Sequence, residues 1–141
     1  MIFRIDTTSS IPVYAQIVDQ IKRAVTAGSL SAGDPLPSLR ELAIKLRINP
    51  LTVNKAYKQL EHEGFVESRQ GTGTFVSTNA QGATDQFRQE ALTRAVDDLL
   101  VDACHLGVSF EELKELVDDR MVAANDGFAR DYAKEKDRDD R

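Results

Sequence analysis

The amino-acid sequence predicts a mainly helical α+β fold, and three observations support this. Three segments within residues 12–64 carry apolar residues at helical spacing and capping residues at their ends. Two short β-rich runs then flank the sequence QGTG, which is typical of a hairpin. Two more helical patterns follow. We therefore expect a compact domain over residues 1–77, a linker over 78–83, a helical region over 84–129 and a charged, disordered tail over 130–141.

Composition and charge fit a globular protein with two unlike halves. Its 141 residues are 41% hydrophobic and 29% charged, and no apolar run approaches the roughly 20 residues of a membrane span. We find no signal peptide, and the single cysteine, Cys104, fits a reducing cytoplasm. Residues 1–77 hold nine Lys and Arg against seven Asp and Glu, a balance of +2. Residues 78–141 hold nine against sixteen, a balance of −7, which completes the net charge of −5.

The first helix is expected between Pro12, which suits a helix start, and Gly28, which suits a C-terminal cap. Its apolar stripe consists of Tyr14, Ile17, Ile21 and Val25. A loop rich in Ser, Gly and Pro follows. Ser38 and Glu41 then form a capping box that starts a second helix. The inner face of this second helix consists of Leu39, Leu42, Ala43 and Leu46.

A proline marks the start of the third helix rather than a break in it. Asn49 is a favoured N-cap, proline is favoured at the first helical position, and Gly64 closes the helix. Its buried stripe consists of Val53, Ala56, Tyr57 and Leu60. Two short helices joined by a tight turn form a helix-turn-helix. The β-rich runs 65–69 and 74–77 add a hairpin, so residues 1–77 are expected to form a winged helix-turn-helix.

The helical region also carries apolar stripes. One consists of Phe87, Ala91, Ala95, Leu99 and Cys104, and Gly107 breaks that helix. Ser109 and Glu112 repeat the capping-box pattern, and the next stripe consists of Leu113, Leu116, Val117 and Met121. A single chain offers little to bury these stripes, so two copies could form a helical bundle. We therefore expect a short two-helix dimerisation element.

The third helix carries polar residues on the face away from its stripe: Thr52, Asn54, Lys55 and Lys58. The first turns of a recognition helix read bases in the major groove, where Asn pairs with adenine and Lys meets guanine or phosphate. The free N–H groups of its first turn would also favour a phosphate. A solvated surface face is the alternative interpretation. The same alternative stands for Arg40 in the second helix and for the hairpin tip with Arg69, Gln70 and Gly71.

At this point the sequence resembles the winged-helix domain of GntR-type bacterial transcription regulators. The motifs GDPLPSLRELA, NPLTVNKAYKQLEHEG and GTGTFV are particularly similar to the YtrA-like subgroup, over about residues 10–77. The short acidic remainder fits that subgroup, whose C-terminal part is a helical dimerisation element. The resemblance implies DNA contacts from nine residues: Arg40, Asn49, Pro50, Thr52, Asn54, Lys55, Arg69, Gln70 and Gly71. Many relatives have arginine where Pro50 and Asn54 stand, so their operators are not expected here.

The sequence therefore predicts a dimeric, sequence-specific DNA-binding regulator in the cytoplasm. We expect it to repress a small operon by binding double-stranded DNA at a pseudo-palindromic operator. The resemblance implies a link to transporter operons. A winged-helix protein-interaction module that binds no DNA is the alternative, favoured by the acidic total charge. No catalytic set, phosphate loop or metal spacing is present, so we expect no enzyme, no metal and no cofactor. A small-molecule effector is possible but unidentified.

Overall fold

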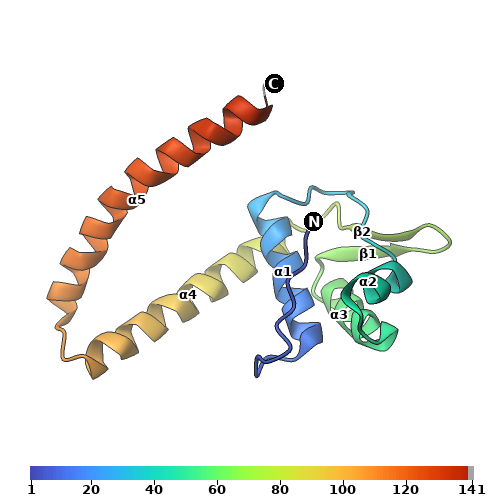
Figure 1. Ribbon diagram of the computed structural model, residues 1–141, viewed down its shortest axis with the longest axis horizontal. Helices are drawn as coiled ribbons and strands as arrows, with labels where there is room; N and C mark the ends of the chain where they lie inside the picture. The colour runs from blue at the N-terminus through green and yellow to red at the C-terminus, as the bar shows by residue number, and fades with distance from the viewer. Residues whose placement is uncertain (140–141) are drawn as a thin grey trace. The chain divides into compact units, whose positions relative to one another are not determined.

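The computed structural model describes residues 1–139, and the chain forms two compact units, of which the first spans Met1–Leu92 and the second begins at Thr93 (Figure 1). The mainly helical α+β fold and the N-terminal winged helix-turn-helix predicted from the sequence are confirmed. The elements in chain order are α1 (Val13–Ala27), α2 (Leu39–Leu46), α3 (Pro50–His62), β1 (Val66–Arg69), β2 (Gly73–Val76), α4 (Gln81–His105) and α5 (Phe110–Asp139).

The two helices of the helix-turn-helix begin where their capping residues predict. The Ser38 hydroxyl accepts a hydrogen bond from the Glu41 N–H, and the Glu41 carboxylate accepts one from the Ser38 N–H, both at 3.1 Å. Pro50 is the first residue of α3, and Asn49 precedes it as the N-cap. Between the helices, Arg47 ends α2 in a left-handed conformation with φ of 55°.

One hydrophobic core holds the first unit together. The stripes predicted for α1, α2 and α3 all pack into it, and α3 contacts α1, α2 and β1. Its largest fully buried side chains are Phe65, Ile17, Ile21, Leu42, Leu60, Val53 and Val76. Because α3 contributes residues to the centre of this core, its position and rotation are fixed by packing on three sides.

The hairpin of β1 and β2 turns through three residues. Arg69 is paired with Gly73, so Gln70, Gly71 and Thr72 form the tip. The Thr72 N–H donates a hydrogen bond to the Arg69 carbonyl at 3.0 Å. Gly71 is the third residue of the four-residue turn 69–72 that this bond closes, and its φ of 76° would be strained for a residue with a side chain. The glycine is therefore required by the turn itself.

The segment before α2 adds a further edge to the hairpin, which the sequence prediction lacks. The Leu36 N–H donates to the Thr74 carbonyl at 2.8 Å, and the Val76 N–H donates to the Asp34 carbonyl at 2.8 Å. This pairing satisfies backbone groups of β2 on the side away from β1. β2 thus lies between β1 and the segment 34–36, which the sequence analysis predicts to be a loop.

The first turns of α4 belong to the winged unit. α4 begins at Gln81, inside the expected linker 78–83. The rings of Phe65 and Phe87 form a T-shaped pair with a centroid distance of 6.1 Å and an interplanar angle of 89°. The Lys22 ammonium lies 5.3 Å from the centre of the Phe65 ring and 5.7 Å from the centre of the Phe87 ring. This packing places the boundary between the units within α4, further along the chain than the sequence suggests.

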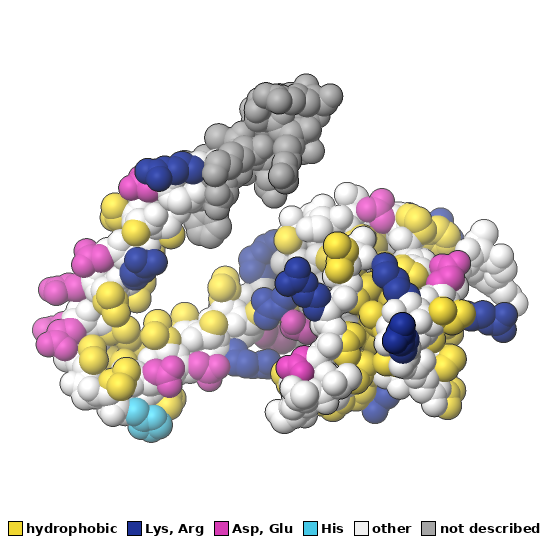
Figure 2. Space-filling model, in the orientation of Figure 1, with side chains coloured by type: hydrophobic (Ala, Val, Ile, Leu, Met, Phe, Trp, Pro, Cys, Tyr) yellow, Lys and Arg dark blue, Asp and Glu magenta, His cyan; other side chains and the backbone are white. Residues whose placement is uncertain are grey.

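The second unit contains the rest of α4 and α5. Gly107, with φ of 70°, separates the helices, as expected. α5 continues to Asp139, so residues 130–139 are helical where we expect disorder; arginine, lysine and glutamate are good helix formers. Residues 140 and 141 of the expected tail lie outside the described residues. Figure 2 shows hydrophobic side chains exposed among acidic ones along these helices. Within the described part of the chain, no helix could span a membrane.

Candidate nucleic-acid interface

α3 presents a polar face to solvent around its N-terminus. Pro50 and Lys55 are exposed, and Thr52 and Asn54 are half-buried at the edge of the core. Lys55 does not extend freely, because its ammonium lies 3.9 Å from the centre of the Tyr14 ring on α1. The face therefore combines the two short hydrogen-bonding side chains of Thr52 and Asn54 with a lysine held towards α1.

The N-cap of α3 accepts hydrogen bonds from the backbone N–H groups that we expected to bind a phosphate. The Asn49 amide oxygen accepts from the Leu51 N–H at 2.9 Å, and the Asn49 carbonyl accepts from the Thr52 N–H at 2.9 Å. Pro50 has no N–H. The first turn thus has no free donor up to Thr52, and of the Asn49 side chain only the amide NH₂ group is left for a ligand.

Two exposed groups flank this helix. Arg40 occupies the second position of α2 and is exposed, and none of the ion pairs found within residues 1–139 involves it. At the hairpin, Arg69, Gln70 and Gly71 are all exposed. Arg69 is already engaged, since its guanidinium contacts the Glu67 carboxylate at 2.9 Å and lies 4.3 Å from the Phe75 ring centre.

The loop leading into α2 is fixed to α3 by a buried tyrosine. The Tyr57 hydroxyl donates to the Pro37 carbonyl at 2.7 Å. Burial, and to a lesser degree the Glu41 carboxylate, raises the pKa of this hydroxyl far above its ordinary value. The group therefore stays protonated and acts as a donor. Tyr57 thus ties the position of α2, with Arg40, to that of α3.

One exposed residue of this face is absent from the sequence prediction. Leu51, at the second position of α3, is 72% exposed and lies outside the buried stripe. Apolar side chains at such positions can contact the thymine methyl group in the major groove. The only sequence signal for it is an apolar residue in the first turn of the helix that lies off the buried stripe, and patterning alone gives such a residue no role.

The fold and this surface define a class of protein. α2 and α3 pack on one another, β1 follows against α3, and the hairpin extends from the same unit (Figure 1). Arg40, the N-terminal face of α3 and the hairpin tip therefore belong to one compact unit. This is the architecture of a winged helix-turn-helix protein.

Comparisons with known proteins identify the family. Residues 13–76 match the family described as bacterial regulatory proteins, gntR family. The chain is 38% identical to the HTH-type transcriptional repressor YtrA of Bacillus subtilis, over 91% of this chain and 98% of that protein. The chain therefore belongs to the GntR family, and the resemblance to YtrA-like regulators is confirmed. The relatives are transcription regulators, so the family also confirms that the chain is not an enzyme.

Solved structures agree with this assignment. A transcriptional regulator from Oenococcus oeni superposes with a TM-score of 0.71 at 38% identity, over 83% of this chain and 97% of that one. YtrA from Sulfolobus acidocaldarius, a GntR-family transcription factor, superposes with a TM-score of 0.52 at 41% identity, over 66% of this chain and 99% of that one. The coverage of the first includes part of the helices that follow the winged unit.

Proposed function

We propose that the protein is a dimeric, sequence-specific DNA-binding repressor that acts in the cytoplasm on a pseudo-palindromic operator of a small operon. The observation that carries the proposal is the start of α3. The Asn49 cap and Pro50 fix the helix register, and a shift of one residue would turn Asn54 by about 100° around the axis. Such a fixed register is what base reading requires.

The proposed division of labour assigns base reading to Thr52 and Asn54, with Leu51 as an apolar neighbour. Arg40 and Lys55 supply positive charge for the DNA backbone, together with the free amide group of Asn49. Arg69, Gln70 and Gly71 reach the adjacent groove. Because Arg69 is paired with Glu67 in the free protein, its use on DNA requires exchange of a carboxylate for a phosphate, both of which suit a guanidinium.

Dimerisation is proposed through the second unit. Within its described residues, Ala103 and Leu113 are buried, whereas many large apolar side chains are exposed: Val96, Leu99, Val101, Leu106, Phe110, Leu116, Val117, Met121 and Val122. Exposed apolar surface of this kind marks an interaction site, and a second copy would form a bundle with it. In sedimentation equilibrium, Leu116→Asp should weaken the dimer, whereas Glu115→Gln on the same helix should not.

Selection of bound duplexes from a randomised DNA library, with the full-length protein at moderate salt, tests the function. Enrichment of an inverted repeat with half-sites about 34 Å apart, one turn of DNA, would support the proposal. Failure to enrich any sequence, together with no retention on DNA resin at low salt, would reject it in favour of a protein-interaction module. The transporter link is supported by the family resemblance alone, and it fails if the selected operator lies away from transporter genes.

A further inference from the structure

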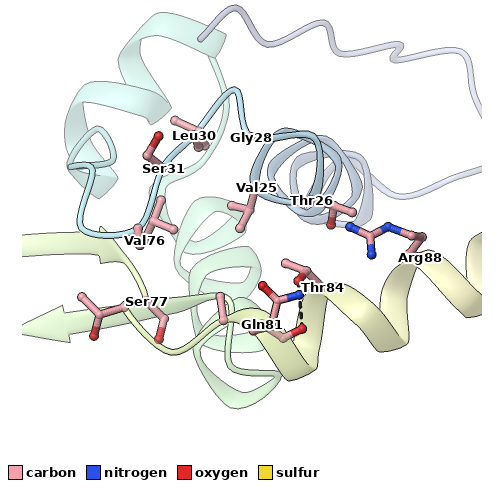
Figure 3. Close-up of a pocket in the computed structure, with 13 residues that line it drawn as sticks. Val25, Thr26, Gly28, Leu30, Ser31, Val76, Ser77, Gln81, Thr84 and Arg88 are labelled. Carbon is pink, nitrogen blue, oxygen red and sulfur yellow. Dashed lines mark hydrogen bonds between the residues drawn. The ribbon is translucent and has the colours of Figure 1, made fainter.

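A cavity of about 380 Å³ lies within the first unit, away from the nucleic-acid face (Figure 3). Its walls come from the end of α1, the loop that follows, the end of β2 and the first turns of α4. The polar side chains that line it are Thr26, Ser31, Ser77, Thr78, Gln81, Thr84 and Arg88. This volume is near the lower end of the range for small-molecule sites, which is about 300–1,000 Å³.

One hydroxyl in this wall has no partner. The Thr26 Oγ1 atom is buried and makes no hydrogen bond within the described residues. The neighbouring Thr84 differs, because its hydroxyl donates to the Gln81 carbonyl at 2.9 Å. An unpaired buried hydroxyl is unfavourable, so this group gains from a hydrogen-bond partner that a ligand supplies.

Two arginines line the cavities beside Thr26. In Figure 3, Arg88 on α4 and Thr26 on α1 point toward one another. A second cavity of about 360 Å³ shares both residues and is also lined by Arg23. Each guanidinium is paired with a carboxylate of its own helix, Arg88 with Asp85 at 3.2 Å and Arg23 with Asp19 at 2.8 Å. These pairs are half-exposed and contribute little, so a ligand can compete for the donors.

The second cavity differs from the first in the character of its remaining wall. Apart from the two arginines and Thr26, its lining is apolar: Ala27, Phe87, Ala91 and Leu92. The two adjoining cavities therefore place cationic donors and an unpaired hydroxyl beside an apolar surface. A ligand with one anionic end and one apolar end matches both parts.

We propose that this site binds a small organic carboxylate. Its carboxylate accepts from the Arg88 and Arg23 guanidinium groups. A rotation of the Thr26 side chain brings the buried hydroxyl to the cavity, where it donates to the same carboxylate, and the apolar part of the ligand lies on Phe87, Ala91 and Leu92. The ligand bridges α1 and α4, so it stabilises the seating of α4 on the winged unit. The proposed ligand site goes beyond the proposed function. Ligand binding is measured without DNA, so a negative result would leave the proposed function intact.

Amide chemical shifts of the full-length protein, titrated with sodium hexanoate at constant ionic strength, test the site. We expect saturable shifts around Thr26, Gln81 and Arg88, and much weaker ones with hexan-1-ol or hexylammonium. Arg88→Gln should weaken hexanoate binding by about tenfold or more, because a charge-assisted hydrogen bond is lost. Arg94→Gln removes an exposed arginine of α4 outside the cavities and should leave the affinity unchanged.

Thr26→Val provides a second, independent test. It replaces the unpaired hydroxyl with a methyl group of similar shape, so it should raise the melting temperature of the ligand-free protein. It should also weaken hexanoate binding several-fold, because the ligand loses one hydrogen bond. Equal shifts from hexan-1-ol, undiminished binding by Arg88→Gln, or binding of inorganic phosphate in place of hexanoate would each overturn the proposal.

Discussion

The hydrogen bond from Tyr57 to Pro37 allows a quantitative test of how α2 is held on α3. Tyr57→Phe keeps the buried ring, which is 5% exposed, and removes the 2.7 Å bond. The Pro37 residue is only half-buried, so water can partly replace the lost donor. We therefore expect a loss of about 1 kcal/mol rather than the about 3 kcal/mol of a sealed carbonyl. For a unit of this size, that corresponds to a fall in melting temperature of about 4–8 °C.

The pH dependence of the same variant checks the cause. The pKa of Tyr57 is raised in the folded state, so folding favours the protonated hydroxyl, and its contribution is complete below the unfolded pKa of about 10. That contribution is lost as pH rises above this value. The wild type should therefore lose stability with alkali more steeply than Tyr57→Phe, and the two unfolding free energies should converge.

Urea unfolding at fixed protein concentration, followed from neutral pH to above pH 10, measures both effects. Tyr14→Phe is the matched control, because its ring stays available to Lys55 and its hydroxyl makes no hydrogen bond found within residues 1–139. Tyr57→Phe with wild-type stability at neutral pH, or a parallel pH dependence in the two proteins, would refute the role of this bond.

Three further substitutions test the interface and its caps. Asn54→Ala should cost about 1–3 kcal/mol of DNA binding and relax base preference at one position; an unchanged sequence logo would contradict its role. Arg40→Ala should reduce the slope of log affinity against log salt by about one, if it contacts a phosphate, and filter binding across salt concentrations would detect an unaltered slope. Ser38→Ala removes the capping box of α2 and should lower the unfolding free energy by about 0.5–2 kcal/mol, as urea melts would measure.

Local signals predicted the parts of the fold that local chemistry determines. Ser38 with Glu41 and Asn49 with Pro50 marked two helix starts, because caps act through groups a few residues apart. The glycines of QGTG marked the hairpin turn for the same reason. The nine proposed contact residues all lie in the winged unit, eight of them around α3 and the hairpin, but their contacts with DNA stay a prediction.

Features set by distant packing were beyond the sequence. Nothing local indicates that Phe87 packs against Phe65, so the sequence assigns Phe87 to the helical region rather than to the winged unit. The contacts of Arg69 with Glu67 and Phe75 could not be predicted either, because a count of charges does not show which side chains form ion pairs. The burial of the Thr26 hydroxyl without a partner is likewise visible only in the folded structure.

The pairing of residues 34–36 with β2 limits how the chain can vary in length. Residues 29–32 precede the ladder and could accept inserted residues without loss of a sheet hydrogen bond. The segment between Asp34 and Ser38 cannot accept an insertion in this way, since one added residue would displace either the hydrogen bonds to β2 or the capping box of α2. Among relatives, we expect insertions to collect in the first stretch and to be excluded from the second.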